Sequence, residues 1–260
     1  MSIFGYIAKG FSIAKSSSRL ILTVFAISFA WVLVNLPFVS PDGAAEPGAV
    51  TVVLGILFML VTVFVQAGTI GYIEQVAKHG SSSLSVFKQA GLKNYFRILG
   101  LGVVMGLVML ILAVIAIIGF LAGGPEAEPS SAAVVLAVIV ALTGLVLLLF
   151  MFMAPYAAVV DGKGVFGALK MSFGIVKRNF WTVLAVGLLM VLVGFAADVV
   201  LRLIGGALAA AMPGKVSQAI AGFLSSGVNA YLGIVTASAF MSVYLTKTSG
   251  VPAGAVSASN

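Results

Sequence analysis

Residues 3–15 read IFGYIAKGFSIAK, and residues 165–177 read VFGALKMSFGIVK. The two stretches align without a gap, share Phe, Gly, Ile and Lys at equivalent positions, and each leads into a long apolar run. A weaker third copy begins at Val86. Copies that start at Ile3, Val86 and Val165 have a period of about 80 residues, which predicts a protein built from internal repeats.

The composition is that of a membrane protein. Of the 260 residues, 62% are apolar and 8% are charged, whereas an ordinary soluble domain is about 25% charged. The mean hydropathy is +1.23. The chain has no cysteine, which excludes disulfides, thiolate metal sites and cysteine nucleophiles. The net charge of +7 is interpreted as a topology signal, and no nucleic-acid partner is expected.

Six stretches are long enough to cross a hydrocarbon core of about 30 Å, which takes about 20 helical residues. We expect these helices near residues 20–39, 50–73, 96–122, 132–158, 180–201 and 217–244. Clusters of Pro and Gly, which end helices, separate the two members of each pair. These turns are expected at residues 40–43, 123–126 and 212–215.

The cations lie on one side of these predicted helices. Of the 14 cations, 12 lie in the N-terminal segment, the longer connections or the C-terminal end: Lys9, Lys15, Arg19, Lys78, Lys88, Lys93, Arg97, Lys163, Lys170, Lys177, Arg178 and Lys247. The short connections hold four acidic residues, Asp42, Glu46, Glu126 and Glu128, and one cation, Lys215. By the positive-inside rule, both termini and the basic connections are cytoplasmic.

Each copy then enters from the cytoplasm, crosses the membrane twice and returns. The prediction is an all-α, polytopic transmembrane bundle of six helices, formed by three parallel helical-hairpin repeats that are each preceded by a cytoplasmic amphipathic segment. Residues 1–247 are expected to form a single integral membrane domain, with repeats at about 3–85, 86–164 and 165–247. The uncharged tail, 248–260, is expected to be disordered.

The first apolar stretch is longer than the apolar core of a cleaved secretory signal, so we expect it to be retained as the first membrane helix.

The amphipathic segments are candidates for membrane-surface contact. Phe166, Leu169, Phe173, Val176 and Phe180 are spaced three or four apart, which predicts one apolar helical face. Such a segment would lie flat on the inner leaflet, and each cation would add about 1 kcal/mol of attraction to anionic lipid headgroups. Two interpretations stay open: the segments only anchor the bundle, or they contact a specific lipid or protein partner. The candidate headgroup contacts are Lys9, Lys15, Lys170, Lys177 and Arg178.

One region carries a family resemblance. Ala154-Pro155-Tyr156 is followed by Asp161-Gly162-Lys163, by ALKMS at residues 168–172 and by KRNFW at residues 177–181. This pattern resembles the broad group of six-helix bacterial membrane proteins that includes the membrane domain of some glycerophosphodiester phosphodiesterases and uncharacterised stand-alone members. The resemblance implies a six-helix fold and an inner-membrane location. It brings no catalytic residues, because the phosphodiesterase domain of the fused members has no counterpart in this sequence.

Ionisable residues inside a membrane are costly and often functional. Asp198 and Arg202 are four apart in the fifth predicted helix, in the favourable acid-first order. Counting about 1.5 Å per residue from Phe180 places Asp198 about 27 Å along the helix, near the outer interface. The pair is interpreted as a structural pin at the lipid boundary, with a gate or ligand contact as the alternative. Glu74 and Lys78 repeat the spacing at a cytoplasmic helix end, where solvation explains them.

The sixth predicted helix has a polar middle. Ser225, Ser226 and Asn229 lie about halfway through it, among small residues at four-residue spacing. Small residues allow close helix packing, and Ser or Asn can bond across helices. Packing explains this stripe, and a polar substrate site is the alternative. Gln66 in the second helix is a possible partner.

The sequence offers no constellation for catalysis. His79 is the only histidine and has no second His, Cys or paired carboxylate at ligand spacing, so we expect neither metal nor cofactor, and no enzyme. The connection from Asp161 to Asn179 could alternatively dock onto a nucleotide-hydrolysing subunit, although Ala168 and Gly174 do not match the usual permease pattern.

Two functional classes follow. The first is a non-enzymatic structural or accessory protein of the inner membrane that interacts with anionic lipids through its basic segments. The alternative is a small transporter or channel with a polar site near the middle of the sixth helix.

Overall fold

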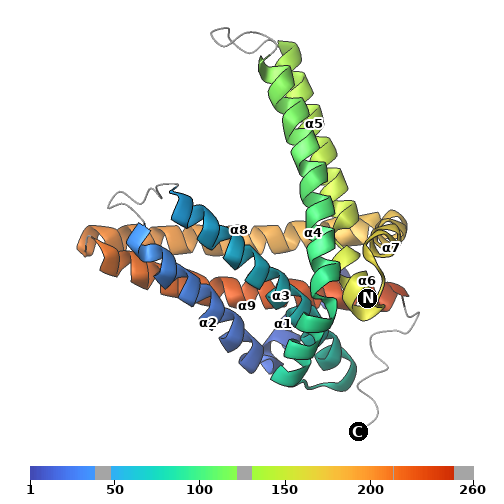
Figure 1. Cartoon of the computed structure of the whole chain (residues 1–260). Helices are drawn as coiled ribbons and strands as arrows, with labels where there is room; N and C mark the ends of the chain where they lie inside the picture. Colours follow the sequence, from blue (N-terminus) through green and yellow to red (C-terminus); the bar gives the residue numbers. More distant parts are fainter. Residues whose placement is uncertain (39–47, 122–130, 213, 249–260) are drawn as a thin grey trace. The chain divides into compact units, whose positions relative to one another are not determined.

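The chain is helical wherever the structure describes a regular element (Figure 1). The computed structural model describes residues 1–38, 48–121, 131–212 and 214–248. The elements are α1 (Ile3–Ser16), α2 (Ser18–Asn35), the 3₁₀-helix η1 (Leu36–Phe38), α3 (Ala49–His79), α4 (Leu84–Leu121), α5 (Ser131–Met151), α6 (Ala154–Val160), α7 (Val165–Arg178), α8 (Phe180–Ala211) and α9 (Lys215–Thr248).

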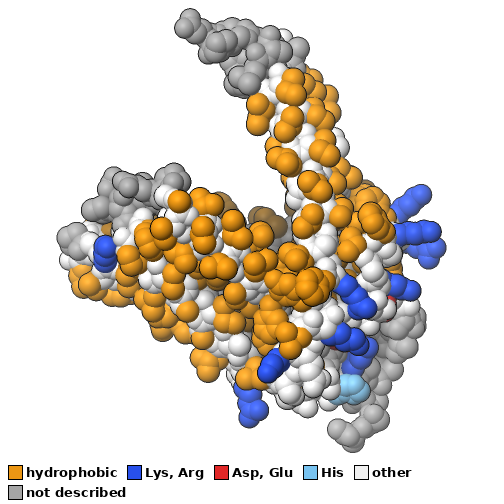
Figure 2. Space-filling model, in the orientation of Figure 1, with side chains coloured by type: hydrophobic (Ala, Val, Ile, Leu, Met, Phe, Trp, Pro, Cys, Tyr) orange, Lys and Arg blue, Asp and Glu red, His pale blue; other side chains and the backbone are white. Residues whose placement is uncertain are grey.

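Within the described ranges, six helical stretches are long and apolar enough to cross a membrane. They are Ser18–Phe38, Ala49–His79, Leu84–Ile118, Ala133–Val160, Phe180–Ala211 and Lys215–Thr248. Apolar side chains cover the outer surfaces of these long helices (Figure 2), as expected where lipid is the solvent. The prediction of an all-α, multi-pass membrane protein is confirmed.

The helix ends follow the predicted turns where the structure describes them. Gly80 ends α3 in the left-handed conformation, with φ 78°, and Gly214 precedes α9 with φ 111°; glycine adopts such backbone angles without a steric cost. The predicted turns at residues 40–43 and 123–126, and the predicted tail after Thr248, lie outside the described residues.

The chain forms two compact units. The first comprises residues 1–95 and 181–260, and the second comprises residues 96–180. The long helix α4 begins in the first unit and continues in the second.

In the first unit, α1, α2 and α3 all pack on α9. A Cβ atom on Gly222 of α9 would collide with the Val32 side chain on α2, so glycine is what lets these two helices approach. Phe25 and Phe29 of α2 pack edge-on against Phe223, with ring centroids 5.0 and 5.2 Å apart. α9, which is the least apolar of the six spans, is also the most buried of them.

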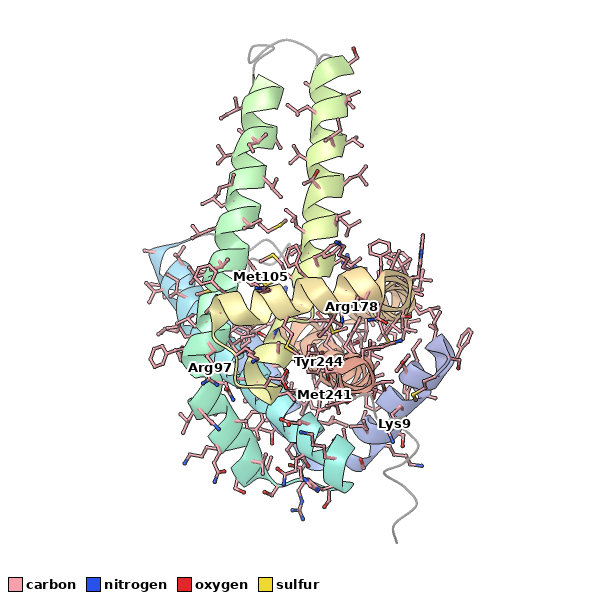
Figure 3. The ribbon with its side chains drawn as sticks, turned by 90° about the vertical axis from the view of Figure 1, so that its right-hand side faces the viewer. Lys9, Arg97, Met105, Arg178, Met241 and Tyr244 are labelled. Carbon is pink, nitrogen blue, oxygen red and sulfur yellow. The ribbon has the colours of Figure 1, made fainter. Side chains whose placement is uncertain are left out.

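In the second unit, α4 and α5 form a long hairpin, and α7 packs on α5 and α6 (Figure 3). A Cβ atom on Gly144 of α5 would lie 3.4 Å from Cδ1 of Leu112 on α4. Pro155 stands in the first turn of α6, and the helix is interrupted just before it, between Met151 and Ala154. Proline lacks the N–H that would continue the helical ladder, which accounts for the break.

The amphipathic segments differ in how they join the spans. α1 ends at Ser16 and α7 at Arg178, and each is 14 residues long. The corresponding middle segment instead runs into its span as one continuous helix, α4. At the first junction the Ser16 and Ser17 hydroxyls both donate to the carbonyl of Ile13, and such bonds compete with the helical ladder.

Candidate functional site

The first amphipathic helix, α1, is held against α9 by its small residues. A Cβ atom on Gly10 would lie 2.7 Å from the Val235 carbonyl oxygen and 3.1 Å from the Ala239 Cβ. Ala14 is completely buried, and Phe11 contacts Tyr231 with ring centroids 6.2 Å apart. The backbone of α1 therefore lies almost directly on the backbone of α9.

The second amphipathic helix, α7, covers the break between α5 and α6. The Ser172 hydroxyl donates to the Phe150 carbonyl at 2.5 Å and accepts from the Met153 N–H at 3.1 Å. Ser172 is fully buried. One side chain thus supplies an acceptor and a donor to a helix that Pro155 interrupts, where backbone groups lose their helical partners.

The two helices bury the same positions of the repeated sequence. The buried residues of α1 are Tyr6, Gly10, Ile13 and Ala14. Those of α7 are Ala168, Ser172, Ile175 and Val176, which are the equivalent positions in the gapless alignment. Two sequences with little side-chain identity at these positions therefore present the same face to the protein.

The opposite side of each helix stays open. Phe4 and its equivalent Phe166 are 74% and 79% exposed. The expected single apolar face of the third copy is thus wrong in part, because Val176 is buried against protein while Phe166 and Phe173 are exposed. The reason is that α7 has two apolar sides. One, of small residues, is buried; the other carries Phe166, which is open, and Phe173, whose ring is partly exposed and contacts Phe150 of α5 with centroids 5.1 Å apart.

The predicted headgroup residues lie on these helices as expected, with one difference. Lys15, Lys170, Lys177 and Arg178 are exposed. Lys9 is only partly exposed at the surface of α1 (Figure 3). Four of these five side chains are therefore open to headgroups, and Lys9 is the one that the fold partly covers.

The middle segment docks on α3. Phe87 is buried and lies over Gly68, where a Cβ atom would be 2.7 Å from the Phe87 carbonyl oxygen and ring. The Phe87 ring also meets Phe64 edge-on, with centroids 5.6 Å apart. The neighbouring cations Lys88 and Lys93 are exposed.

The ionisable pairs in the spans are local. Nε of Arg202 lies 2.6 Å from Oδ2 of Asp198, and the two side chains are 79% and 53% exposed. Lys78 and Glu74 form a similar pair at 2.6 Å at the end of α3. Each pair joins residues four apart on one helix, so neither pair joins two helices.

The polar residues in the middle of α9 do not form a cluster. Ser226 is buried, and the Ser225 hydroxyl donates to the Gly222 carbonyl of its own helix at 3.1 Å. Asn229 on α9 and Gln66 on α3 are both exposed, and neither forms a hydrogen bond with a residue that the structure describes. The structure therefore does not join Gln66 to Asn229.

Sequence reasoning missed Ser172. It lies in the quoted stretch 168–172, and Pro155 in the first quoted stretch was a signal, because a proline interrupts the helical ladder and leaves carbonyls of the preceding turn without partners. The carbonyl that Ser172 serves in that turn is the one of Phe150. Among the described residues no group of three or more His, Asp or Glu side chains is placed to hold a metal ion.

The chain was compared with known proteins and families. No curated protein and no solved structure matches it. The family model described as "Domain of unknown function (DUF7847)" matches residues 1–246. The chain, which has six candidate membrane spans among its described residues, therefore belongs to the DUF7847 family, whose role the family description leaves open.

Proposed function

We propose that the chain is a non-enzymatic accessory protein of the bacterial inner membrane that binds anionic lipids through its basic amphipathic segments, with both termini in the cytoplasm. The observation that carries the proposal is the open side of α1 and α7. After their small residues are buried on protein, exposed Phe and Lys remain together on each helix. Apolar and cationic residues side by side on an interfacial helix favour an anionic leaflet.

Three parallel repeats are part of this proposal. Three helices each contain a buried tyrosine: Tyr72 in α3, Tyr156 in α6 and Tyr244 in α9. Each amphipathic segment docks within about ten residues before one of them: the middle segment on α3, α7 on the α5–α6 break and α1 on α9. Recurrence of one docking position supports three related hairpins. The resemblance to the membrane domain of some glycerophosphodiester phosphodiesterases fits the same architecture.

Lipid retention tests the proposal. The protein would be purified in nanodiscs of phosphatidylglycerol and phosphatidylcholine and released into the gas phase. Native mass spectrometry would then identify the lipids that stay bound to it. We expect preferential retention of phosphatidylglycerol, reduced when Lys9, Lys15, Lys170 and Lys177 are changed to Gln. The control is Lys215→Gln, which removes one cation at the start of α9, on the side of the membrane opposite to the basic segments, and should leave phosphatidylglycerol retention unchanged. Unchanged retention in the four-lysine variant would remove the basis of the proposal.

Orientation is tested separately with an impermeant thiol reagent on intact cells. The chain has no native cysteine, so single cysteines report cleanly. Gly43→Cys should react from outside, and Ser81→Cys should not, because the positive-inside rule places the α3–α4 connection in the cytoplasm. The reverse pattern would invert the proposed topology.

A small transporter is the second candidate, and Asn229 favours it. Its exposed amide lies about 21 Å from Lys215 along α9, near the middle of a span, where an unpaired polar group is costly. A small solute that is retained by the purified protein and lost in Asn229→Leu would support transport. Unchanged solute retention in that variant would exclude Asn229 as the site.

A further inference from the structure

The exposed side of α7 carries an alternating line of two aromatic rings and two cations. Phe166, Lys170, Phe173 and Lys177 follow one another at spacings of four, three and four residues, which places all four on one side of an α-helix. Phe166 is 79% and Phe173 39% exposed, and both lysines are exposed. None of these four residues is among the buried residues of α7, although the Phe173 ring contacts the Phe150 ring of α5, with centroids 5.1 Å apart.

The direction of this line is fixed by the opposite side of the helix. Ala168, Ser172 and Val176 are completely buried, and Ser172 is hydrogen-bonded to the backbone at the α5–α6 break. A helix held in this way cannot rotate about its axis without losing those contacts. The Phe and Lys side chains therefore keep one orientation whatever lies against them.

We propose that this line inserts into the cytoplasmic leaflet as a fixed wedge, with Phe166 and Phe173 at the level of the upper acyl chains and Lys170 and Lys177 on lipid phosphates. The inference rests on the proposed function and adds insertion to it. Charge complementarity selects the occupant, because two cations that alternate with two exposed rings match an anionic phospholipid surface.

The equivalent line on α1 is a natural comparison. It reads Phe4, Ala8, Phe11 and Lys15, so it keeps both rings and one of the two cations. Phe4 is 74% exposed, whereas Phe11 is only partly exposed and contacts Tyr231 of α9. The buried face of α1 is likewise locked, by Gly10 against α9. α1 is thus a weaker version of the same design, with one open ring, Phe4, and one exposed cation, Lys15.

A third side of α7 gives an internal control. Gly174 lies about 80° around the helix from Phe166 and is exposed, and a Cβ atom there would meet nothing within 4 Å. Gly174 is four residues from both Lys170 and Arg178, so it lies at the polar edge of the proposed contact, away from the Phe166 ring. A tryptophan at residue 174 should therefore lie at the level of the headgroups, closer to water than a tryptophan at residue 166.

Tryptophan fluorescence tests the insertion. The two native tryptophans would be removed by Trp31→Phe and Trp181→Phe, and Phe166→Trp or Gly174→Trp introduced, in nanodiscs that contain phosphatidylglycerol and acyl-brominated phosphatidylcholine. We expect Phe166→Trp to be blue-shifted and quenched by brominated lipid at least roughly twofold more than Gly174→Trp, with the reverse order for aqueous acrylamide. Phe4→Trp should resemble Phe166→Trp.

Equal acrylamide quenching of Phe166→Trp and Gly174→Trp would overturn the insertion. Shielding of Phe166→Trp from both quenchers would also overturn it, because protein rather than lipid would then cover the line. Phosphatidylglycerol retention by Lys170→Gln/Lys177→Gln separates the two proposals. Reduced retention with a water-exposed Phe166→Trp would leave lipid binding standing and remove only the wedge.

Discussion

α1 and α7 dock through the same position of the repeat, yet that position is Gly10 in one and Ser172 in the other. α1 lies on α9, which is unbroken, and the constraint there is space: a Cβ atom would lie 2.7 Å from the Val235 carbonyl oxygen. α7 lies on a helix that is interrupted before Pro155, and the constraint there is unpaired backbone, which the Ser172 hydroxyl satisfies.

The middle segment shows a third arrangement, in which the small residue is on the receiving helix. Gly68 of α3 makes room for Phe87. The three docking sites thus share a location and differ in chemistry. The residue at each contact is set by the state of the backbone opposite, so it cannot be read from its own copy alone.

The largest expected effect is that of Gly10→Leu. Its side chain would meet backbone atoms of α9, which cannot move aside by changing rotamer, so we expect a loss of about 3 kcal/mol or more in the free energy of unfolding. The measurement is the Tm of the protein in nanodiscs. Gly174→Leu, in open space on α7, is the control. If both variants melted alike, α1 would not be docked as described.

Ser172→Ala should cost about 1–3 kcal/mol, because a buried N–H and a buried carbonyl lose their partner together. The same change at the exposed Ser12 of α1 should cost much less. The comparison sharpens with Pro155→Ala, which removes the block to a continuous helix, in which the Phe150 carbonyl and the Met153 N–H would find helical partners in Ala154 and Leu149. In that background Ser172→Ala should cost less, with a coupling of about 0.5–3 kcal/mol. Strictly additive effects would show that Ser172 does not serve the break.

The smallest expected effect is on lipid retention, and it concerns the exposed sides of α7 and α1. Lys170→Ala gives α7 the composition that α1 has at Ala8. Loss of about 1 kcal/mol of attraction should weaken phosphatidylglycerol retention about fivefold, and Ala8→Lys should strengthen it. Lys215→Ala is the control for lost charge, and Tm should not change in any of the three. An equal loss in Lys215→Ala would show that net charge, rather than the line on α7, governs lipid binding.

Much of the helical layout could be predicted from residue order. Apolar length located all six spans, and Gly214 lies in the turn predicted there. The continuity of α4 was not predicted, because its segment at 86–97 echoes the other two copies although it lacks their break. The periodicity of Phe166 and Val176 also misled, since spacing groups apolar residues on one side without separating a lipid-facing ring from a packed one.

The candidate site also has features that the sequence predicted and one that it did not. Exposure of Lys15, Lys170 and Lys177 followed from their position on amphipathic segments. The separation of Gln66 from Asn229 did not, because sequence spacing on two different helices says nothing about the rotation of one against the other.

The sequence by itself determined that this chain has six membrane-length apolar helices, roughly where each of them lies, and which segments are amphipathic, because these depend on local composition and period. Only the tertiary structure decided which side of each amphipathic helix is buried. It also showed why the same position of the repeat is glycine at residue 10 and serine at residue 172. Both outcomes depend on a backbone contact between segments that are far apart along the chain. Such contacts leave no periodic signal in either segment.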